Sequence, residues 1–474
     1  MRSAMKLSYH LNKQDPCPLY LQLYQQIRLA IHQQQLQLGE KLPSKRQLCE
    51  FLQISQNTVE SAYMQLQAEG YIESKARRGF FVSFQAELQF SSTKIYQNRP
   101  HFSPPNDIQY DLNPNYIDTQ HFPFLRWQKC GRYILQKSQK HLLALGEKQG
   151  DLNLRSEIAH YLAASRGVYC EPEQIIIGAG IENCLQQLIL LFNQRYPQRD
   201  FSYAMESHGY HSVEKILHSY QKQTIKLSLS ADNYQLNIAE LYQYQANVAY
   251  ITPAHIYPFG TPISISQRQQ LLEWANAAPD RYLIEDDYDS EFRYQGKPIP
   301  ALQSLDVQEK VIYFGSFSKL FMPSLRTAFM VLPKSLLADY QQYCGFFNCS
   351  VSRFEQQRLA QFMQQGEFEK HIHRMRKIYR KKMALLCQLF QPYSHKIRYY
   401  GEHCGVYLLI ELINEQRSVE HITQRAEQEK IKLYPVYFQQ KCLFSLGFGN
   451  LTEQALESAV KKLITIFINQ EETP

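Results

Sequence analysis

Apolar and polar positions alternate with a helical period near the start of the chain. Between residues 19 and 36 the apolar or aromatic positions recur at steps of three and four residues, which predicts an amphipathic helix. These positions are Tyr20, Leu23, Tyr24, Ile27, Ala30 and Ile31. We expect this face of the helix to be buried.

Capping signals predict two further helices. Pro43 stops the preceding segment from continuing as helix, and Ser44 with Gln47 three residues later forms a capping box that begins a second helix. Ser55 is the expected N-cap of a third helix, which Gly70 ends. The residues expected to face inward are Leu48, Phe51 and Leu52 in the second helix and Val59, Ala62, Tyr63 and Leu66 in the third.

A hairpin pattern follows the three helices. Residues 71–82, YIESKARRGFFV, alternate, turn, and alternate again. Two short helices joined by a tight turn and followed by a basic hairpin form a winged helix-turn-helix, which enters the major groove of DNA. The residues that we expect to face DNA are Ser44, Arg46, Gln56, Asn57 and Thr58 near the helix starts, and Arg77 and Arg78 on the wing. Any one of them alone could be an ordinary surface residue.

Residues 39–82, GEKLPSKRQLCEFLQISQNTVESAYMQLQAEGYIESKARRGFFV, resemble the GntR-type DNA-binding domain. The family pattern is LPSxRxLa, then vSrxTVxxAYxxLxxeGyi, then a wing with RxGxxV. Gln56 departs from it, because many members carry arginine there. The resemblance therefore implies an operator DNA partner but not the operator sequence.

A polar segment, residues 84–107, predicts a linker between a DNA-binding domain at 1–83 and a second domain at 108–474. In the second domain apolar strands alternate with helical stretches, which predicts an α/β fold with a mostly parallel sheet. Such sheets bind ligands at the carboxyl ends of their strands.

Three predicted strands are followed by residues that carry chemistry. After residues 173–177 a glycine turn opens into a helix, whose first amides suit a phosphate; they belong to Gly180, Ile181 and Glu182. After residues 281–284 comes EDDYDSEF, which by itself could be a solvated acidic loop or a loose metal site. After residues 311–315 come Ser316, Ser318 and Lys319.

A phosphate cradle, a carboxylate and an amine at one edge of one sheet fit pyridoxal 5'-phosphate (PLP). A lysine can form an imine with the aldehyde, and a carboxylate can keep the pyridine nitrogen protonated. Helix amides, hydroxyls and an arginine can hold the phosphate. The sequence therefore predicts PLP as the cofactor.

Residues 108–474 resemble the fold type I aminotransferases. Matching segments include GDLNLRSEIAHYLAASRGV, EQIIIGAGIENCLQQL, TPAHIYPFGTPIS, EDDYDSEF and SFSKLFMPSLR. By this resemblance Lys319 is the Schiff-base lysine, Asp286 the partner of the pyridine nitrogen, and Tyr288 a donor to the ring hydroxyl. The phosphate ligands would be Arg326, Ser316 and Ser318, with Tyr210 stacked on the ring. His255 and Tyr257 could also line the pocket.

A GntR-like domain fused to an aminotransferase-like domain is the layout of the MocR regulators. The resemblance implies a domain-swapped homodimer that senses a small molecule. In aminotransferases an arginine in the pattern lRlgF binds the substrate carboxylate. The matching position here is Ser445, whose hydroxyl supplies neither the positive charge nor the two parallel hydrogen bonds of a guanidinium. Glu182 stands where relatives often carry glutamine. We therefore expect ordinary amino acids to bind poorly.

Three functions fit these features. The first is a regulator that senses PLP itself to control vitamin B6 synthesis. The second is a MocR regulator whose PLP captures an amine effector such as γ-aminobutyrate or taurine. The third is an active aminotransferase with a vestigial DNA-binding domain, which the intact helix-turn-helix and Ser445 disfavour, so enzyme activity stays uncertain.

Composition and charge indicate which partners and which cell compartment we expect for this protein. The chain has 474 residues and a net charge of +7, and its first 83 residues hold ten Lys and Arg against six Asp and Glu, which favours an anionic partner. It has no apolar run of the roughly 18 residues that would span a membrane and no signal-like N-terminus, so we expect a soluble cytoplasmic protein without a membrane partner. The ten scattered cysteines predict reduced thiols and no metal site.

Overall fold

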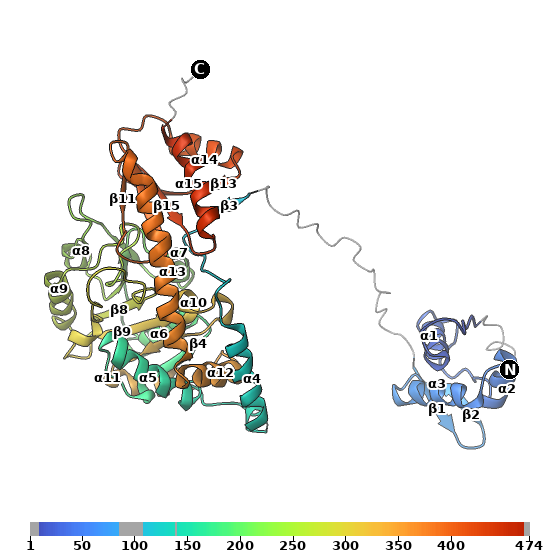
Figure 1. Cartoon of the computed structure of the whole chain (residues 1–474). Helices are drawn as coiled ribbons and strands as arrows, with labels where there is room; N and C mark the ends of the chain where they lie inside the picture. Colours follow the sequence, from blue (N-terminus) through green and yellow to red (C-terminus); the bar gives the residue numbers. More distant parts are fainter. Residues whose placement is uncertain (1–8, 85–107, 138–139, 469–474) are drawn as a thin grey trace. The chain divides into compact units, whose positions relative to one another are not determined.

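The computed structural model describes residues 9–84, 108–137 and 140–468. The chain forms two compact units, Met1–Pro104 and Pro105–Pro474 (Figure 1). Their boundary falls in the segment predicted as a linker, most of which, residues 85–107, lies outside the described residues. None of the helices in the described ranges is long and apolar enough to cross a membrane.

The first unit is the predicted three-helix domain with a hairpin wing. Its elements are α1 (Leu19–His32), α2 (Lys45–Leu52), α3 (Gln56–Ala68), β1 (Ile72–Lys75) and β2 (Gly79–Val82). Both hydrogen bonds of the Ser44–Gln47 capping box are present, and Ser55 caps α3. The strands pair antiparallel, with Ile72 opposite Val82. Local capping signals thus define the helix starts.

Two residues predicted to be inward lie at the surface. Tyr20 in the first turn of α1 is 38% exposed and Phe51 in α2 is 52% exposed. The eight-residue α2 fully buries only Leu48, and Leu52 is half-buried. A domain this small covers only one face of a short helix, so an apolar residue on the neighbouring face stays in solvent.

The second unit is built on a seven-stranded sheet in the order β4-β10-β9-β8-β7-β5-β6. The strands are β4 (Ile175–Gly178), β5 (Tyr203–Glu206), β6 (Thr224–Leu227), β7 (Val248–Ile251), β8 (Tyr282–Asp287), β9 (Val311–Ser316) and β10 (Ala328–Val331). Only β10 runs antiparallel to its neighbours, so the sheet is mostly parallel, as predicted. Alternate residues of β4 enter different apolar cores, which shows that both faces are covered.

Helices cover the sheet and connect it to a second sheet. They are α4 (Phe124–Lys137), α5 (Leu152–Arg166), α6 (Ile181–Arg195), α7 (His211–Ser219), α8 (Ala239–Gln243), α9 (Ile265–Asn276), α10 (Phe317–Leu320), α11 (Lys334–Cys344) and α12 (Arg353–Gln364). The long α13 (Glu367–Phe390) runs from α12 to the second sheet (Figure 1).

The second sheet is antiparallel, in the order β11-β12-β15-β14. Its strands are β11 (Ile397–Tyr400), β12 (Tyr407–Leu412), β14 (Tyr434–Phe438) and β15 (Lys441–Gly447). The helices α14 (Val419–Gln428) and α15 (Glu453–Ile468) follow in the same part of the chain, and β3 (Tyr110–Asp111) pairs with β13 (Ile431–Lys432). A smaller α+β layer therefore adjoins the large sheet, and side chains of β12, β14 and β15 share an apolar core with those of the large sheet.

Candidate ligand and DNA sites

The carboxyl ends of three strands, β4, β8 and β9, lie near one another along one edge of the large sheet. Because β4 and β9 both pair with β10, Gly178 and Ser316 flank the same residue, Ala328. On the other side of β9, Asp287 at the end of β8 lies beside Gly315. The glycine turn, the acidic segment and the lysine segment therefore meet, as their positions after three strands led us to expect.

Lys319 lies in α10, the four-residue helix that follows β9. Its half-buried Nζ donates to the carbonyl oxygen of Pro114 at 2.7 Å and to Oδ1 of Asn115 at 3.3 Å. Burial lowers the pKa of Lys319 to about 8, and the Asp289 carboxylate opposes this shift. Near neutral pH the nucleophilic free amine is thus far more populated than in a solvated lysine.

Asp286 is a buried carboxylate on β8. Its Oδ2 accepts a hydrogen bond from the Tyr250 hydroxyl on the neighbouring strand β7, whereas its Oδ1 has no partner among the described residues. Burial raises the pKa of Asp286 to about 7, and the bond from Tyr250 acts against this rise. A buried acceptor without a donor is costly, so Oδ1 can receive an N–H from a ligand.

The acidic segment is not the loop that the sequence suggested. The strand β8 continues to Asp287, and its three acids are buried. Glu285 accepts hydrogen bonds from two backbone N–H groups, and Asp287 pairs with Arg166 at 2.5 Å and accepts from the Tyr313 hydroxyl at 2.7 Å. These partners compensate part of the cost of burying the carboxylates, although Oδ1 of Asp287 has no partner among the described residues. In the described part of the chain, no group of His, Cys, Asp and Glu side chains could hold a metal ion.

Beyond β8, Tyr288 is held by a buried histidine. Its hydroxyl donates to the backbone carbonyl of His255 at 2.9 Å, and the His255 imidazole stacks between the rings of Tyr288 and Tyr407. Burial lowers the pKa of His255, but the Asp289 carboxylate, 2.9 Å from Nδ1, outweighs it and raises that pKa well above its usual value. The His255–Asp289 pair and the stacked rings therefore hold Tyr288 in position.

The glycine turn holds an ion pair. Gly180 is the N-cap of α6 with a φ of +91°, and a side chain there would collide with the guanidinium of Arg326. Arg326 Nη2 lies 2.9 Å from Oε2 of Glu182, in the first turn of α6, which begins at Ile181. The guanidinium that the resemblance assigns to a phosphate thus contacts a carboxylate of the chain itself.

Two further hydroxyl groups belong to residues predicted to bind the cofactor. The Tyr210 hydroxyl is 3.5 Å from Oε1 of Glu182, and its side chain is exposed. The Oγ of Ser316 accepts a hydrogen bond from the backbone N–H of Ser318 at 3.1 Å, which caps α10. All the residues predicted to bind the cofactor therefore come from segments that converge on this edge.

Ser445 lies on β15, fully buried, opposite Leu409 and Tyr434. Its hydroxyl has no hydrogen-bond partner among the residues described. Position 445 thus offers a small buried hydroxyl and no guanidinium for a substrate carboxylate.

The predicted DNA-facing residues lie on the starts of α2 and α3 and on the wing. Arg46, Gln56 and Asn57 are exposed, and Arg46 Nε lies 2.9 Å from Oε1 of Glu50. Ser44 and Thr58 lie at the helix starts, where the Thr58 hydroxyl bonds to that of Ser55. On the wing, the turn holds two exposed arginines, Arg77 and Arg78.

Comparison with protein families matches both units. The model described as "Bacterial regulatory proteins, gntR family" covers residues 19–82, and "Aminotransferase class I and II" covers residues 107–463. Helix-turn-helix regulators match nearly the whole chain, among them YdeL of Bacillus subtilis (strain 168), 38% identical over 97% of this chain and 99% of that protein. The chain is a MocR-type transcriptional regulator.

Two further relatives of this MocR-type regulator carry functional names. The probable rhizopine catabolism regulatory protein MocR of Rhizobium meliloti is 27% identical over 97% of this chain and 96% of its own length. The pyridoxine biosynthesis transcriptional regulator PdxR of Corynebacterium glutamicum is 30% identical over 79% of this chain and 80% of its own length. An archaeal alanine:glyoxylate aminotransferase shares the fold, with a TM-score of 0.66 at 19% identity, over 76% of this chain and 90% of its own.

Sequence patterns missed several residues at the sheet edge that carries Lys319. Tyr250 contacts Asp286 only because β7 pairs with β8, and Pro114 and Asn115 reach Lys319 from a segment 205 and 204 residues away. No periodicity in the sequence encodes these contacts. Asp289 belongs to the acidic segment EDDYDSEF, but no pattern in the sequence shows that it pairs with His255.

Proposed function

We propose that this regulator binds PLP at Lys319 and operator DNA through its winged helix, and that PLP itself is the signal. The observation that carries the proposal is the buried, unpartnered Oδ1 of Asp286 at the same sheet edge as a lysine whose pKa is lowered to about 8. An acceptor without a donor and a reactive amine are what a pyridine ring with an aldehyde requires.

The side chains at the edge fit the three parts of PLP. When bound, PLP supplies an aldehyde for a primary amine and a ring that withdraws electrons. Asp286 would accept the pyridine N–H, and Tyr288 would donate to the ring hydroxyl once its O–H turns away from the His255 carbonyl oxygen. The phosphate would lie among Arg326, the hydroxyls of Ser316 and Ser318, and the first amides of α6; these amides belong to Gly180, Ile181 and Glu182. Tyr210, at the exposed rim, would cover the ring.

Two features favour PLP over an amino acid as the signal. Ser445 provides no guanidinium for a carboxylate, so an α-amino acid lacks its usual anchor. The relative PdxR is named for pyridoxine biosynthesis. The second candidate is an amine effector that reacts with bound PLP, and the relative MocR, named for the catabolism of rhizopine, favours it.

Exposed apolar side chains support a homodimer. Between residues 124 and 145 four large apolar residues are at least 66% exposed, and they are Phe124, Leu125, Leu143 and Leu145. These four residues are near one another in the sequence, and large exposed apolar side chains that lie together mark interaction surfaces. We expect analytical ultracentrifugation to give the mass of a dimer, and a monomer at all concentrations would contradict this.

A mobility shift with DNA from upstream of the regulator's own gene tests the proposal. PLP is titrated alone, and then candidate amines are added at saturating PLP. We expect PLP alone to change the DNA affinity of the wild type but not of Lys319→Ala. A response that requires an amine would favour the second candidate. If the protein binds no DNA under any of these conditions but transfers an amino group from an amino acid to a keto acid, it is an aminotransferase and not a regulator.

A further inference from the structure

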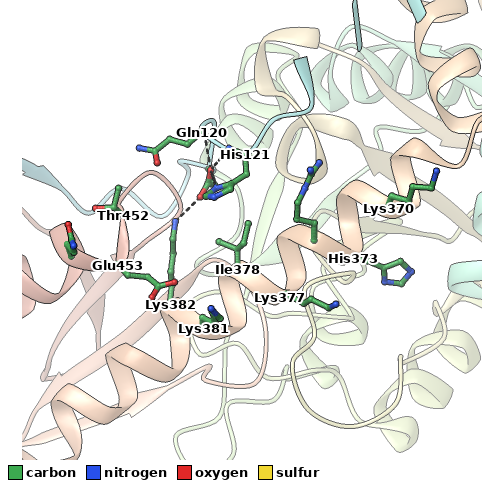
Figure 2. Close-up of a pocket in the computed structure, with 13 residues that line it drawn as sticks. Gln120, His121, Lys370, His373, Lys377, Ile378, Lys381, Lys382, Thr452 and Glu453 are labelled. Carbon is green, nitrogen blue, oxygen red and sulfur yellow. Dashed lines mark hydrogen bonds and ion pairs between the residues drawn. The ribbon is translucent and has the colours of Figure 1, made fainter. Parts of the chain in front are cut away.

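A groove with a volume of about 890 Å³ lies along α13 in the second unit (Figure 2). Its other walls are the segment that holds Asp118 and His121 and the start of α15. None of the residues proposed to bind PLP lines it. The groove is therefore separate from the sheet edge that carries Lys319.

The floor of the groove is a fixed, charge-balanced network. Lys382 and Asp118 are both buried, and Lys382 Nζ lies 3.0 Å from Oδ2 of Asp118 and donates to the carbonyl oxygen of Gly449 at 3.1 Å. Asp118 Oδ1 also lies 3.0 Å from Nδ1 of His121 (Figure 2). The floor supplies shape but little net charge.

The wall formed by α13 is strongly basic. Four exposed cationic residues line the groove from this helix at steps of three and four residues: Lys370, Arg374, Lys377 and Lys381. Of these, Lys370 is paired with Glu367 at 3.0 Å. Within the described residues Lys377 and Lys381 form no ion pair, although they lie four residues apart, where like charges destabilise a helix. Glu453 is the one acidic lining residue apart from Asp118. Uncompensated repulsion on one helix face indicates an anionic partner from outside the unit.

The lining favours a polyanion over a small anion. The groove is open, and most of its free positive charges belong to lysines. A lysine ammonium is a hydrated point charge, whereas an arginine guanidinium has a fixed geometry that selects a small planar anion. From Lys370 to Lys381 the helix rises about 16 Å, which is the rise of about five base pairs of one DNA strand. We propose that this groove binds the phosphate backbone of duplex DNA.

This inference rests on the proposed DNA binding, and it adds a second, sequence-independent contact. The test uses the full chain with Lys377→Gln and Lys381→Gln combined. The matched control, Lys297→Gln with Lys334→Gln, removes the same charge from two exposed lysines outside the groove. The probes are a long upstream fragment with the operator at its centre and the same fragment with scrambled flanks, titrated by anisotropy at several salt concentrations.

We expect the groove variant to lower the affinity by about tenfold and to reduce the slope of log K against log salt by about 2, because each lost lysine–phosphate contact removes about 1. The loss should be equal for both fragments and absent in the control. Wild-type affinity and slope in the groove variant, or an equal loss in the control, would overturn the groove contact while leaving the winged-helix function intact. Failure of the wild type to bind DNA would instead refute the proposed function.

Discussion

Glu182 should weaken the binding of PLP, because its carboxylate occupies the arginine that a phosphate would use. Arg326 Nη2 is 2.9 Å from Glu182 Oε2, and the Tyr210 hydroxyl lies 3.5 Å from the other oxygen. In the substitution Glu182→Gln the side chain keeps its size and loses its charge. The guanidinium would then be free for the phosphate.

The magnitude follows from two contributions. The side chains of Arg326 and Glu182 are 53% and 29% exposed, so their pair is screened and stabilises by about 0.2–1 kcal/mol. A carboxylate about 5 Å from a phosphate charge repels it by about 1 kcal/mol in water-like surroundings. Removing both gives about 1–2 kcal/mol, which corresponds to about 5- to 30-fold tighter binding.

The assay is a titration of the apo regulator with PLP, followed by absorbance. Pyridoxal, which lacks the phosphate, is the matched ligand, and Glu457→Gln on α15 is the matched protein control. We expect Glu182→Gln to bind PLP more tightly and pyridoxal with unchanged affinity. If the ratio of the two affinities equals that of the wild type, Glu182 does not compete with the phosphate.

Three further predictions concern the two sites. Asp286→Asn should weaken PLP binding by more than tenfold, because a hydrogen bond to a charged group contributes about 1.5–3 kcal/mol, and an unchanged titration would exclude this role. The amine of Lys319 reacts only when it is deprotonated. The rate of PLP binding in stopped flow should therefore rise about tenfold per pH unit up to the Lys319 pKa of about 8 and then level off. A rate that does not depend on pH over this range would contradict the prediction. Arg46→Ala should weaken operator binding in anisotropy by about tenfold, and affinity should fall steeply with salt, whereas a salt-insensitive complex would exclude phosphate contacts.

The sequence predicted the winged helix well because its signals are local. The Ser44–Gln47 box and the Ser55 cap depend on residues three positions apart, and both are present. Burial was less predictable. Phe51 repeats at helical spacing but is exposed, since the described part of the small domain leaves that side of α2 open to solvent.

At the sheet edge that carries Lys319 the order of strands and turns was predictable, whereas the partners of the side chains were not. The acids of β8 look like a polar loop in the sequence, but Asp287 is paired with Arg166, which lies 121 residues earlier. The pair between Arg326 and Glu182 likewise joins positions 144 residues apart. Contacts of this kind depend on strand order in the folded sheet, and no periodic pattern carries that information.

The most direct test of the central claim is borohydride trapping of the purified regulator after incubation with PLP, with the modified peptide identified by mass spectrometry. We predict a single phosphopyridoxyl adduct on Lys319, which is absent from Lys319→Ala. A wild-type protein that gains no adduct, or gains it equally on several surface lysines, would contradict the account.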